Sequence, residues 1–457
     1  MIIAILLRVY EVFRFPFEQD ELYTIDEAMN LFHTHLLPGI QARPFFFLLE
    51  HPFLTLGDPT APLVRFLPLL FGVAGVWVTW RLARDLAGPV AGLAALILVT
   101  ISPWHLYASG FGRYYSLLYL LATIVYWRLP IASDLDQPRE YVFVLVPLFL
   151  GAWTHPSFVF PVVGVALAIS IFHGDGTVRF RWPTRTAWTW LWGPFLILSA
   201  CVAGTIRLLY HNTNVANGGD RGLQATLRLV PAMIDWMTLI VAAAAFAGVI
   251  LLLRSSLPSR RRFGSMVVFG SVLTLVALFA LSFRTSIYAD YGIAALPLLL
   301  VAAAYPTGLL AGSGDPITAS AGSAVLTWIL VIGVLPSTVS HLSDGTRFDY
   351  REAFSQINRT APDIEVLAWP IVIQREYAPA LHSREMPSTA VGLDSALSMY
   401  RDLWAIASVK RYGMVGDDTG DMARWFWQNC RKEGQFERPR LDYRIYRVDL
   451  WRCTVRE

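Results

Sequence analysis

Apolar residues occur along most of this chain in runs of membrane-spanning length, separated by short polar segments. A helix needs about 20 apolar residues to cross a hydrocarbon core of about 30 Å, and a helix in a soluble core would also need a polar face. The pattern therefore predicts a polytopic α-helical membrane protein with about 11 transmembrane helices. The expected spans are 1–10, 61–80, 87–103, 114–129, 141–154, 157–172, 187–206, 236–253, 264–282, 292–311 and 322–339.

The hydrophobic pattern changes near Ser340, where long apolar runs give way to a mixed polar sequence. Short apolar runs and alternation of apolar with polar residues are typical of strands. We therefore expect a transmembrane domain over residues 1–340 and a small C-terminal α/β domain over residues 341–457. Its expected elements are strands at Ile364–Leu367, Ile371–Ile373 and Tyr443–Val448 and a helix at Asp349–Asn358.

Basic residues cluster in alternate loops, which fixes the expected orientation. Short basic loops stay in the cytoplasm. The N-terminus is then cytoplasmic, while the first polar loop (11–60) and the C-terminal α/β domain are extracytoplasmic. The clusters are Arg81 and Arg84; Arg179, Arg181 and Arg185; and Arg254, Arg260, Arg261 and Arg262. The remaining segments expected outside are 102–113, 154–155, 207–235 and 284–291.

Composition agrees with a membrane protein and excludes some partners. Hydrophobic residues make up 55% of the chain and charged residues 16%, against about 25% charged in soluble proteins. The net charge of +3 is too small to indicate a nucleic-acid partner. The cysteines at 201, 430 and 453 form no CxxC motif, which argues against structural zinc. Cys430 and Cys453 are candidates for a disulfide, with two unpaired thiols as the alternative.

The first polar loop carries five carboxylates within residues 18–27. A partly buried carboxylate can act as a general base or hold a divalent cation. A solvated acidic helix start is the alternative. The sequence does not separate Asp20 from Glu21, or either from Asp26 and Glu27.

Cations and polar residues are expected at the same outer face. Arg113, at the start of a span, could grip a phosphate group, or it could be an interfacial anchor. His155 could ligate a metal ion or bind a phosphate, or be an ordinary interfacial residue. Together these would form one cleft with acidic and basic halves, suited to an anionic lipid-linked donor. The other outer-face candidates are Arg43, Asp58, Arg65, Arg284 and Tyr288.

Several short motifs in residues 8–160 resemble those of the GT-C superfamily of polyprenyl-phosphate-sugar-dependent glycosyltransferases. Arg8 precedes Asp20-Glu21 by the family's interval of about a dozen residues, and Pro44–Leu49 is similar to its "PPLYYLL" helix. More narrowly, the pattern is similar to bacterial relatives of the dolichyl-phosphate-mannose–protein mannosyltransferases. The other matches are Gly57-Asp58, Arg65–Pro68 with Phe71-Gly72, Ser102-Pro103 with Ser109, Arg113 and Tyr115, His155, and Asp349–Arg351.

The resemblance implies a glycosyltransferase that moves a hexosyl or pentosyl group, with inversion, from a polyprenyl-phosphate carrier to an acceptor hydroxyl on a lipid, glycan or protein. Asp20 and Glu21 are then the expected catalytic pair. The expected phosphate-binding residues are Arg113, Arg65 and Tyr115. Glu21 is expected to position the acceptor or, together with His155, to bind a divalent metal ion. The implied location is the bacterial inner membrane.

Two departures from the family pattern are visible. Phe111 stands where the family has a Glu, and Arg43 stands where it has His or Pro. The other functions considered are a flippase or transporter of lipid-linked sugars and an oligosaccharide polymerase or ligase. Transport predicts ionisable residues in mid-membrane, and the expected span centres contain almost none. Ligases usually carry a long outer loop between late spans, whereas here the outer mass follows the last span.

Overall fold

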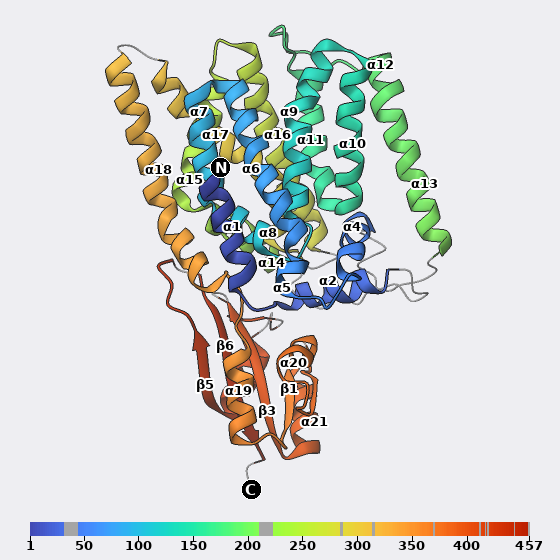
Figure 1. Ribbon diagram of the computed structural model, residues 1–457, viewed down its shortest axis with the longest axis vertical. Coiled ribbons are helices and arrows are strands. Elements are labelled where there is room, and N and C mark those ends of the chain that lie inside the picture. The colour runs from blue at the N-terminus through green and yellow to red at the C-terminus, as the bar shows by residue number, and fades with distance from the viewer. Residues whose placement is uncertain are drawn as a thin grey trace.

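The computed structural model describes residues 1–31, 44–209, 223–283, 287–312, 316–368, 371–410, 413–415, 417, 420–442 and 444–455. A bundle of apolar helices occupies one end of the molecule, and a sheet flanked by short helices occupies the other (Figure 1). We call the second part the C-terminal region (residues 345–455). Helix α18 (Pro316–Asp344) leads from one to the other. The expected boundary at residue 340 therefore falls in the last turn of a continuous helix.

Six helical segments in the described part of the chain are long and apolar enough to cross a membrane, or up to eight if each of two bent pairs counts as one span. The chain is thus a multi-pass membrane protein, while the expected number of eleven spans is not confirmed. Several expected spans are helices of only 13 or 17 residues, short of the 20 or so that a span needs. The bundle helices are α1 (Ile2–Arg14), α6 (Phe66–Ala87), α7 (Pro89–Ile101), α9 (Tyr115–Leu135), α10 (Pro138–Thr154), α11 (Val159–Ile171), α12 (Arg185–Ala187), α13 (Gly193–Leu209), α15 (Leu239–Leu253), α16 (Pro258–Ser282) and α17 (Leu296–Ala311).

Two segments expected as outer loops contain helices instead. Residues 102–113 include α8 (Pro103–Gly110), which is bent by 57° from α7. Ser102 ends α7 and caps α8, where its hydroxyl accepts the His105 N–H at 3.4 Å and Pro103 occupies the first turn. Helix α14 (Leu223–Met237) lies in the expected loop 207–235 and meets α15 at 96°. Hydropathy does not show such bends, because the residues on both sides of the break are apolar.

The first polar loop is also largely helical. Helix α1 continues to Arg14, and α2 (Gln19–Met29), α4 (Pro44–Leu54) and α5 (Ala61–Val64) follow. Helix α2 lies across the end of the bundle, beside the C-terminal region (Figure 1). The Tyr377 hydroxyl of that region donates to the Phe17 carbonyl at 2.9 Å, just before α2. Helix α2 is therefore held between the two parts of the molecule.

The C-terminal region contains one mixed sheet with strand order β2-β1-β3-β6-β5, and β4 pairs with β3. Strands β1, β2 and β3 are parallel, whereas β6 is antiparallel to both β3 and β5. The expected strand at 364–367 and helix at 349–358 are confirmed to within a few residues, but Ile371–Ile373 lies in a helix. Of the strand expected at 443–448, residues 446–448 begin β6, and residue 443 lies outside the described residues. The elements are α19 (Arg351–Thr360), β1 (Glu365–Ala368), α20 (Ile371–Tyr377), β2 (Ser383–Glu385), α21 (Ala390–Tyr400), β3 (Asp402–Lys410), β4 (Gly413–Met414), α22 (Asp421–Asn429), β5 (Cys430–Glu437) and β6 (Tyr446–Thr454).

Strand β3 is buried on both faces. Successive side chains of a strand point to opposite sides. Leu403 and Ala405 accordingly pack into one hydrophobic cluster with α21 and α22, while Trp404 and Ile406 join the main core. Strand β3 is the middle strand of the sheet. Its last residue, Lys410, pairs with Tyr446 at the start of β6.

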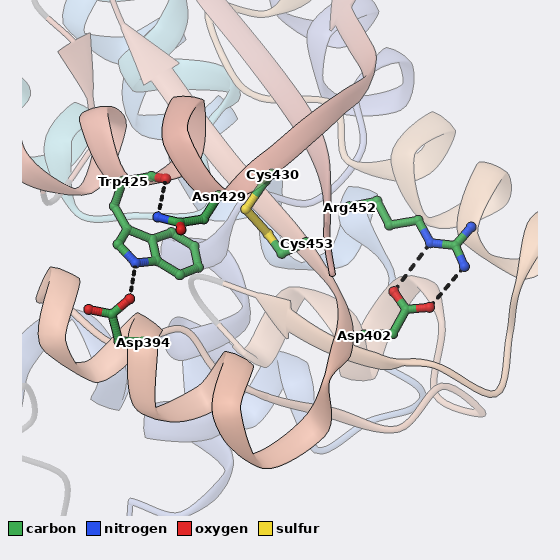
Figure 2. Close-up of a disulfide and its surroundings, with 7 residues drawn as sticks. All are labelled: Asp394, Asp402, Trp425, Asn429, Cys430, Arg452 and Cys453. Atoms are coloured by element: carbon green, nitrogen blue, oxygen red, sulfur yellow. Dashed lines mark hydrogen bonds and ion pairs between the residues drawn. A yellow bond between two sulfur atoms is a disulfide. The ribbon is translucent and has the colours of Figure 1, made fainter. Parts of the chain in front are cut away.

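A disulfide joins Cys430 and Cys453, which confirms the candidate pair (Figure 2). The two residues face each other directly across β5 and β6, with their Cα atoms 4.1 Å apart. Asp402 and Arg452 form an ion pair at 2.9 Å beside it. The bridge closes a loop with a sequence separation of 23 and attaches the edge strand β5 to the sheet.

Removing this bridge should destabilise the protein. The C430A/C453A double variant is expected to lose about 3 kcal/mol of unfolding free energy, because the unfolded chain regains the freedom of a loop of this size. Urea unfolding of the full chain in detergent, followed by tryptophan fluorescence, measures this. C201A is the matched control, since Cys201 is exposed on α13. An unbridged Cys430 in a non-reduced peptide digest would contradict the assignment.

Candidate active site

Helix α2 separates the two adjacent acids of the first loop. Asp20 and Glu21 lie in its first turn, and neighbouring residues of a helix point about 100° apart. The Asp20 side chain is 41% exposed, whereas Glu21 is completely buried. The sequence could not distinguish these residues, and the geometry does.

The Glu21 carboxylate is surrounded by five donors. Its Oε1 accepts from Arg65 Nε at 2.6 Å and from the Gly112 N–H at 2.8 Å. Its Oε2 accepts from Arg65 at 2.7 Å, from Arg347 at 3.3 Å and from the Glu18 N–H at 3.0 Å. Burial raises the pKa of Glu21, but the two arginines hold it below its ordinary value. Glu21 is therefore a buried anion that fixes the positions of its neighbours.

Arg65 and Arg347 have no room for a further ligand. Both are fully buried. Arg65 also donates to the carbonyls of Val12, Phe15 and Pro16, at 3.2, 2.8 and 2.9 Å. Its expected role in holding a phosphate is not supported, because its donors are already engaged. Arg65 instead joins the end of α1 to α2 and α6.

Gly112 shows why glycine stands in the turn between α8 and α9. A Cβ atom at this position would lie 2.4 Å from Val64 Cγ1 and 3.2 Å from Glu21 Oε1. Only a residue without a side chain lets the backbone N–H approach the carboxylate this closely. The turn then places Arg113 beside α2.

Arg113 faces the exposed acid. Its guanidinium lies 3.7 Å from Asp20 and 3.7 Å from Glu27, and it donates to Thr24 Oγ1 at 3.1 Å. Burial lowers the pKa of Arg113, but the two carboxylates raise it above its ordinary value. The arrangement therefore presents a fixed cation directly beside an accessible carboxylate. The structure thus brings Arg113 next to Asp20, the accessible acid of the pair, and next to Glu27.

His155 lies in an aromatic stack. Its ring is 4.9 Å from Tyr114 and 4.8 Å from Tyr291, and its Nδ1 lies 2.8 Å from Ser157 Oγ. The described residues contain no group of three or more His, Cys, Asp or Glu that could hold a metal ion. Glu21 does not fit the role of a ligand, because arginines and backbone N–H groups already surround its oxygens. The predicted Glu21–His155 metal site is thus not supported.

The other predicted site residues are scattered. Asp58 is exposed in the bend after α4, Tyr288 is 46% exposed, and Tyr115 is buried against Phe111. Arg43 and Arg284 lie outside the described residues. Phe111, which replaces the family's acid, covers the Arg347 guanidinium at 5.6 Å.

Three residues that the sequence did not single out interact electrostatically with one another or with Asp20. Glu18 precedes α2, Asp290 lies in η3 (Ala289–Ala295), and Lys410 ends β3. Lys410 interacts electrostatically with both Glu18 and Asp290, and Asp290 in turn interacts with Asp20. Long sequence separations hid this group, because nothing local marks Asp290 or Lys410 as neighbours of α2.

Glu18 has an unusual environment for an acid. Burial raises its pKa to about 7, with Asp20 and Glu21 adding to the effect and Arg347 and Lys410 opposing it. Its Oε2 has no hydrogen-bond partner among the described residues. Glu18 therefore changes its charge near neutral pH.

Comparison with known proteins places this geometry in a known fold. No family model and no curated protein matches the chain. Among solved structures, ArnT from Cupriavidus metallidurans bound to undecaprenyl phosphate has a TM-score of 0.53 at 13% identity, over 98% of this chain and 96% of that one. The Archaeoglobus fulgidus oligosaccharyltransferase in the apo form has a TM-score of 0.52 at 10% identity, over 89% and 69%. Its complex with Zn and sulfate has a TM-score of 0.51 at 11% identity, over 91% and 72%.

At these identities the similarity establishes the fold alone. The match extends over nearly the whole chain in ArnT, including the C-terminal region. This chain therefore shares its fold with ArnT from Cupriavidus metallidurans and with the Archaeoglobus fulgidus oligosaccharyltransferase.

Loss of the Glu21 carboxylate should unfold the site. E21A leaves Arg65 and Arg347 buried without their counter-ion, and we expect a loss of about 3–5 kcal/mol. Thermal unfolding in detergent measures this. E433A is the control, because Glu433 pairs at the surface with the exposed Arg431, and such a pair contributes less than about 1 kcal/mol. An E21A variant as stable as wild type would remove Glu21 from its structural role.

Glu18 should make stability pH-dependent. Since folding raises its pKa from 4.5 to about 7, its contribution is fully present below pH 4.5 and is lost as the pH rises through 7. E18Q remains uncharged, so its stability should match wild type at pH 4.5 and exceed it increasingly up to about pH 7. Unfolding midpoints across this range test the prediction, with E376Q on the exposed face of α20 as control. A constant difference between E18Q and wild type would be inconsistent with it.

Proposed function

We propose that this chain, a multi-pass membrane protein with the GT-C fold, is a glycosyltransferase that takes a hexosyl or pentosyl group from a polyprenyl-phosphate carrier. The observation that carries the proposal is the pairing of an accessible acid, Asp20, with a fixed cation, Arg113, at 3.7 Å. The fold match to a structure bound to undecaprenyl phosphate supports the choice of donor. The acceptor is a hydroxyl group of a lipid, glycan or protein.

Asp20 is the proposed general base. It is the acid of the pair whose side chain solvent reaches, whereas Glu21 is enclosed by donors. A base must come within hydrogen-bond distance of the proton that it removes, which a completely buried carboxylate cannot do for an incoming acceptor. Glu21 and Arg65 act as positioning residues that fix the first turn of α2.

Arg113 is the proposed contact for the carrier phosphate. At 3.7 Å its ion pairs with Asp20 and Glu27 are longer than a direct hydrogen bond, so the guanidinium can be shared with a phosphate oxygen. As negative charge grows on the leaving phosphate, a preorganised cation stabilises the transition state. Sharing Arg113 with the donor also loosens its hold on Asp20.

The reaction then balances as a single displacement. The acceptor hydroxyl gives its proton to Asp20 while its oxygen forms a bond to the anomeric carbon. The bond from that carbon to the phosphate oxygen breaks, and the electron pair leaves with the polyprenyl phosphate. Attack opposite the leaving group inverts the anomeric configuration. Glu21 and His155 do not fit a metal site, because arginines and backbone N–H groups already surround the Glu21 oxygens.

The proposed location is a bacterial inner membrane, with the C-terminal region outside the cytoplasm. The disulfide is typical of an oxidising compartment. Arg81 and Arg84 lie in the last two turns of α6, and the segment before α12 is also basic. The C-terminal end of α6 and helix α12 both lie at the end of the bundle opposite the C-terminal region (Figure 1). Short basic loops favour the cytoplasm, so both features support one orientation.

Replacing the proposed base should abolish transfer without unfolding the protein. D20N is expected to slow sugar transfer at least about 100-fold, since it removes proton abstraction. Release of polyprenyl phosphate from purified protein, supplied with a panel of polyprenyl-phosphate sugars and acceptor extract, measures this. The matched control is D26N, because Asp26 is exposed on the same helix. Wild-type transfer by D20N would remove Asp20 from the base role.

A further inference from the structure

The charges around Asp20 leave the site short of cations. Five carboxyl groups face three arginines: two of the arginines are held by Glu21, and Arg113 faces both Asp20 and Glu27. The other two carboxyl groups, of Glu18 and Asp290, interact electrostatically with Asp20. A donor phosphate brings one more negative charge into this group. Its binding therefore calls for a further cation that is not in direct contact with a carboxylate.

Lys410 meets this need from the opposite side. It is exposed, and its ammonium lies 5.7 Å from the Phe348 ring and 5.6 Å from the Tyr446 ring. These rings support the charge without neutralising it. Lys410 interacts electrostatically with Glu18 and Asp290, and both of these carboxyl groups interact with Asp20.

The end of β3 is fixed against the bundle, which gives Lys410 a defined position. Lys410 pairs with Tyr446 in the sheet. Two residues earlier, Arg444 donates to the Ser337 carbonyl of α18 at 3.4 Å and stacks on Trp236 of α14 at 4.9 Å. The β3–β6 end of the sheet is thus packed on the bundle helices, and Lys410 at this end interacts with Glu18, the residue before α2.

Lys410 is a lysine in a chain whose basic residues are nearly all arginines. The chain has 37 lysines and arginines together, of which only Lys410 and Lys432 are lysines. A lysine is a compact point charge on a flexible stem, whereas an arginine is a rigid planar fork. The flexible side chain of a lysine can adjust to a phosphate carried by a mobile lipid, while the end of β3 holds the backbone of Lys410 in place.

We propose that Lys410 binds the phosphate of the polyprenyl donor from the side opposite Arg113, so that the C-terminal region forms part of the donor site. The inference rests on the proposed function, because it takes the donor to be a polyprenyl phosphate. It assigns the C-terminal region a direct part in donor binding.

The test compares binding of undecaprenyl phosphate and of uncharged undecaprenol to the full chain in neutral-lipid nanodiscs. K410M is expected to bind undecaprenyl phosphate about 10- to 100-fold more weakly, since it loses a charge-assisted hydrogen bond. Its binding of undecaprenol should not change. K410R should retain part of the preference for the phosphate. K432M is the matched control, because Lys432 lies on β5 with an ion pair to Asp449 at 2.9 Å and a contact to the Trp451 ring at 5.7 Å.

The outcomes separate the two proposals. If wild type binds both lipids equally, the polyprenyl-phosphate donor is wrong, and the role of Lys410 falls with it. If wild type prefers the phosphate and K410M keeps that preference, the role of Lys410 alone is overturned. If phosphatidylglycerol competes as well as undecaprenyl phosphate and the competition depends on Lys410, the residue binds membrane headgroups and the proposal also fails. Unchanged unfolding midpoints for K410M and K410R show that any loss is one of binding.

Discussion

The arrangement of this site depends on one buried anion. Glu21 brings together Arg65 at the start of α6, Arg347 after α18 and the Gly112 turn before α9. Isolated charges are very costly to bury, so the carboxylate and its two arginines are stable only as a group. Elements more than 300 residues apart in sequence therefore meet at one carboxylate. Asp20 inherits its position from this group, since the two acids share one helical turn.

Candidate residues that stand in short motifs were predictable from the sequence, although the motifs themselves lie far apart in the chain. The interval from Arg8 to Asp20-Glu21 and the position of Arg113 identified the acidic and basic sides, because short motifs in loops between spans survive as local patterns. The same reasoning assigned Arg65 to a ligand, since exposure cannot be read from a residue type. Whether an arginine faces a substrate or a buried glutamate depends on tertiary contacts that no local pattern records.

The type of fold was predictable from the sequence, but the arrangement of its elements in space was not. Long apolar runs identified a multi-pass bundle, and alternation identified strands near the C-terminus. The helices α8 and α14 were missed because each is bent by more than 40° from a neighbouring helix at a short break, which hydropathy does not show. The order of the strands and the packing of the β3–β6 end against the bundle could not be predicted, because both depend on contacts between distant parts of the chain. The position of Lys410 could therefore not be predicted either.

The link between α1 and α2 has a further consequence. Arg65 binds the carbonyls of Phe15 and Pro16, which fixes the rotational phase at which α2 begins. Each residue advances a helix by about 100°, so one inserted residue in this link would turn the accessible acid away from Arg113 and bring another side chain to the arginines. The number of residues between the first helix and the acidic pair thus determines the direction in which Asp20 points as well as the distance that the link spans. Natural variation in this segment should replace residues freely but tolerate changes of length poorly.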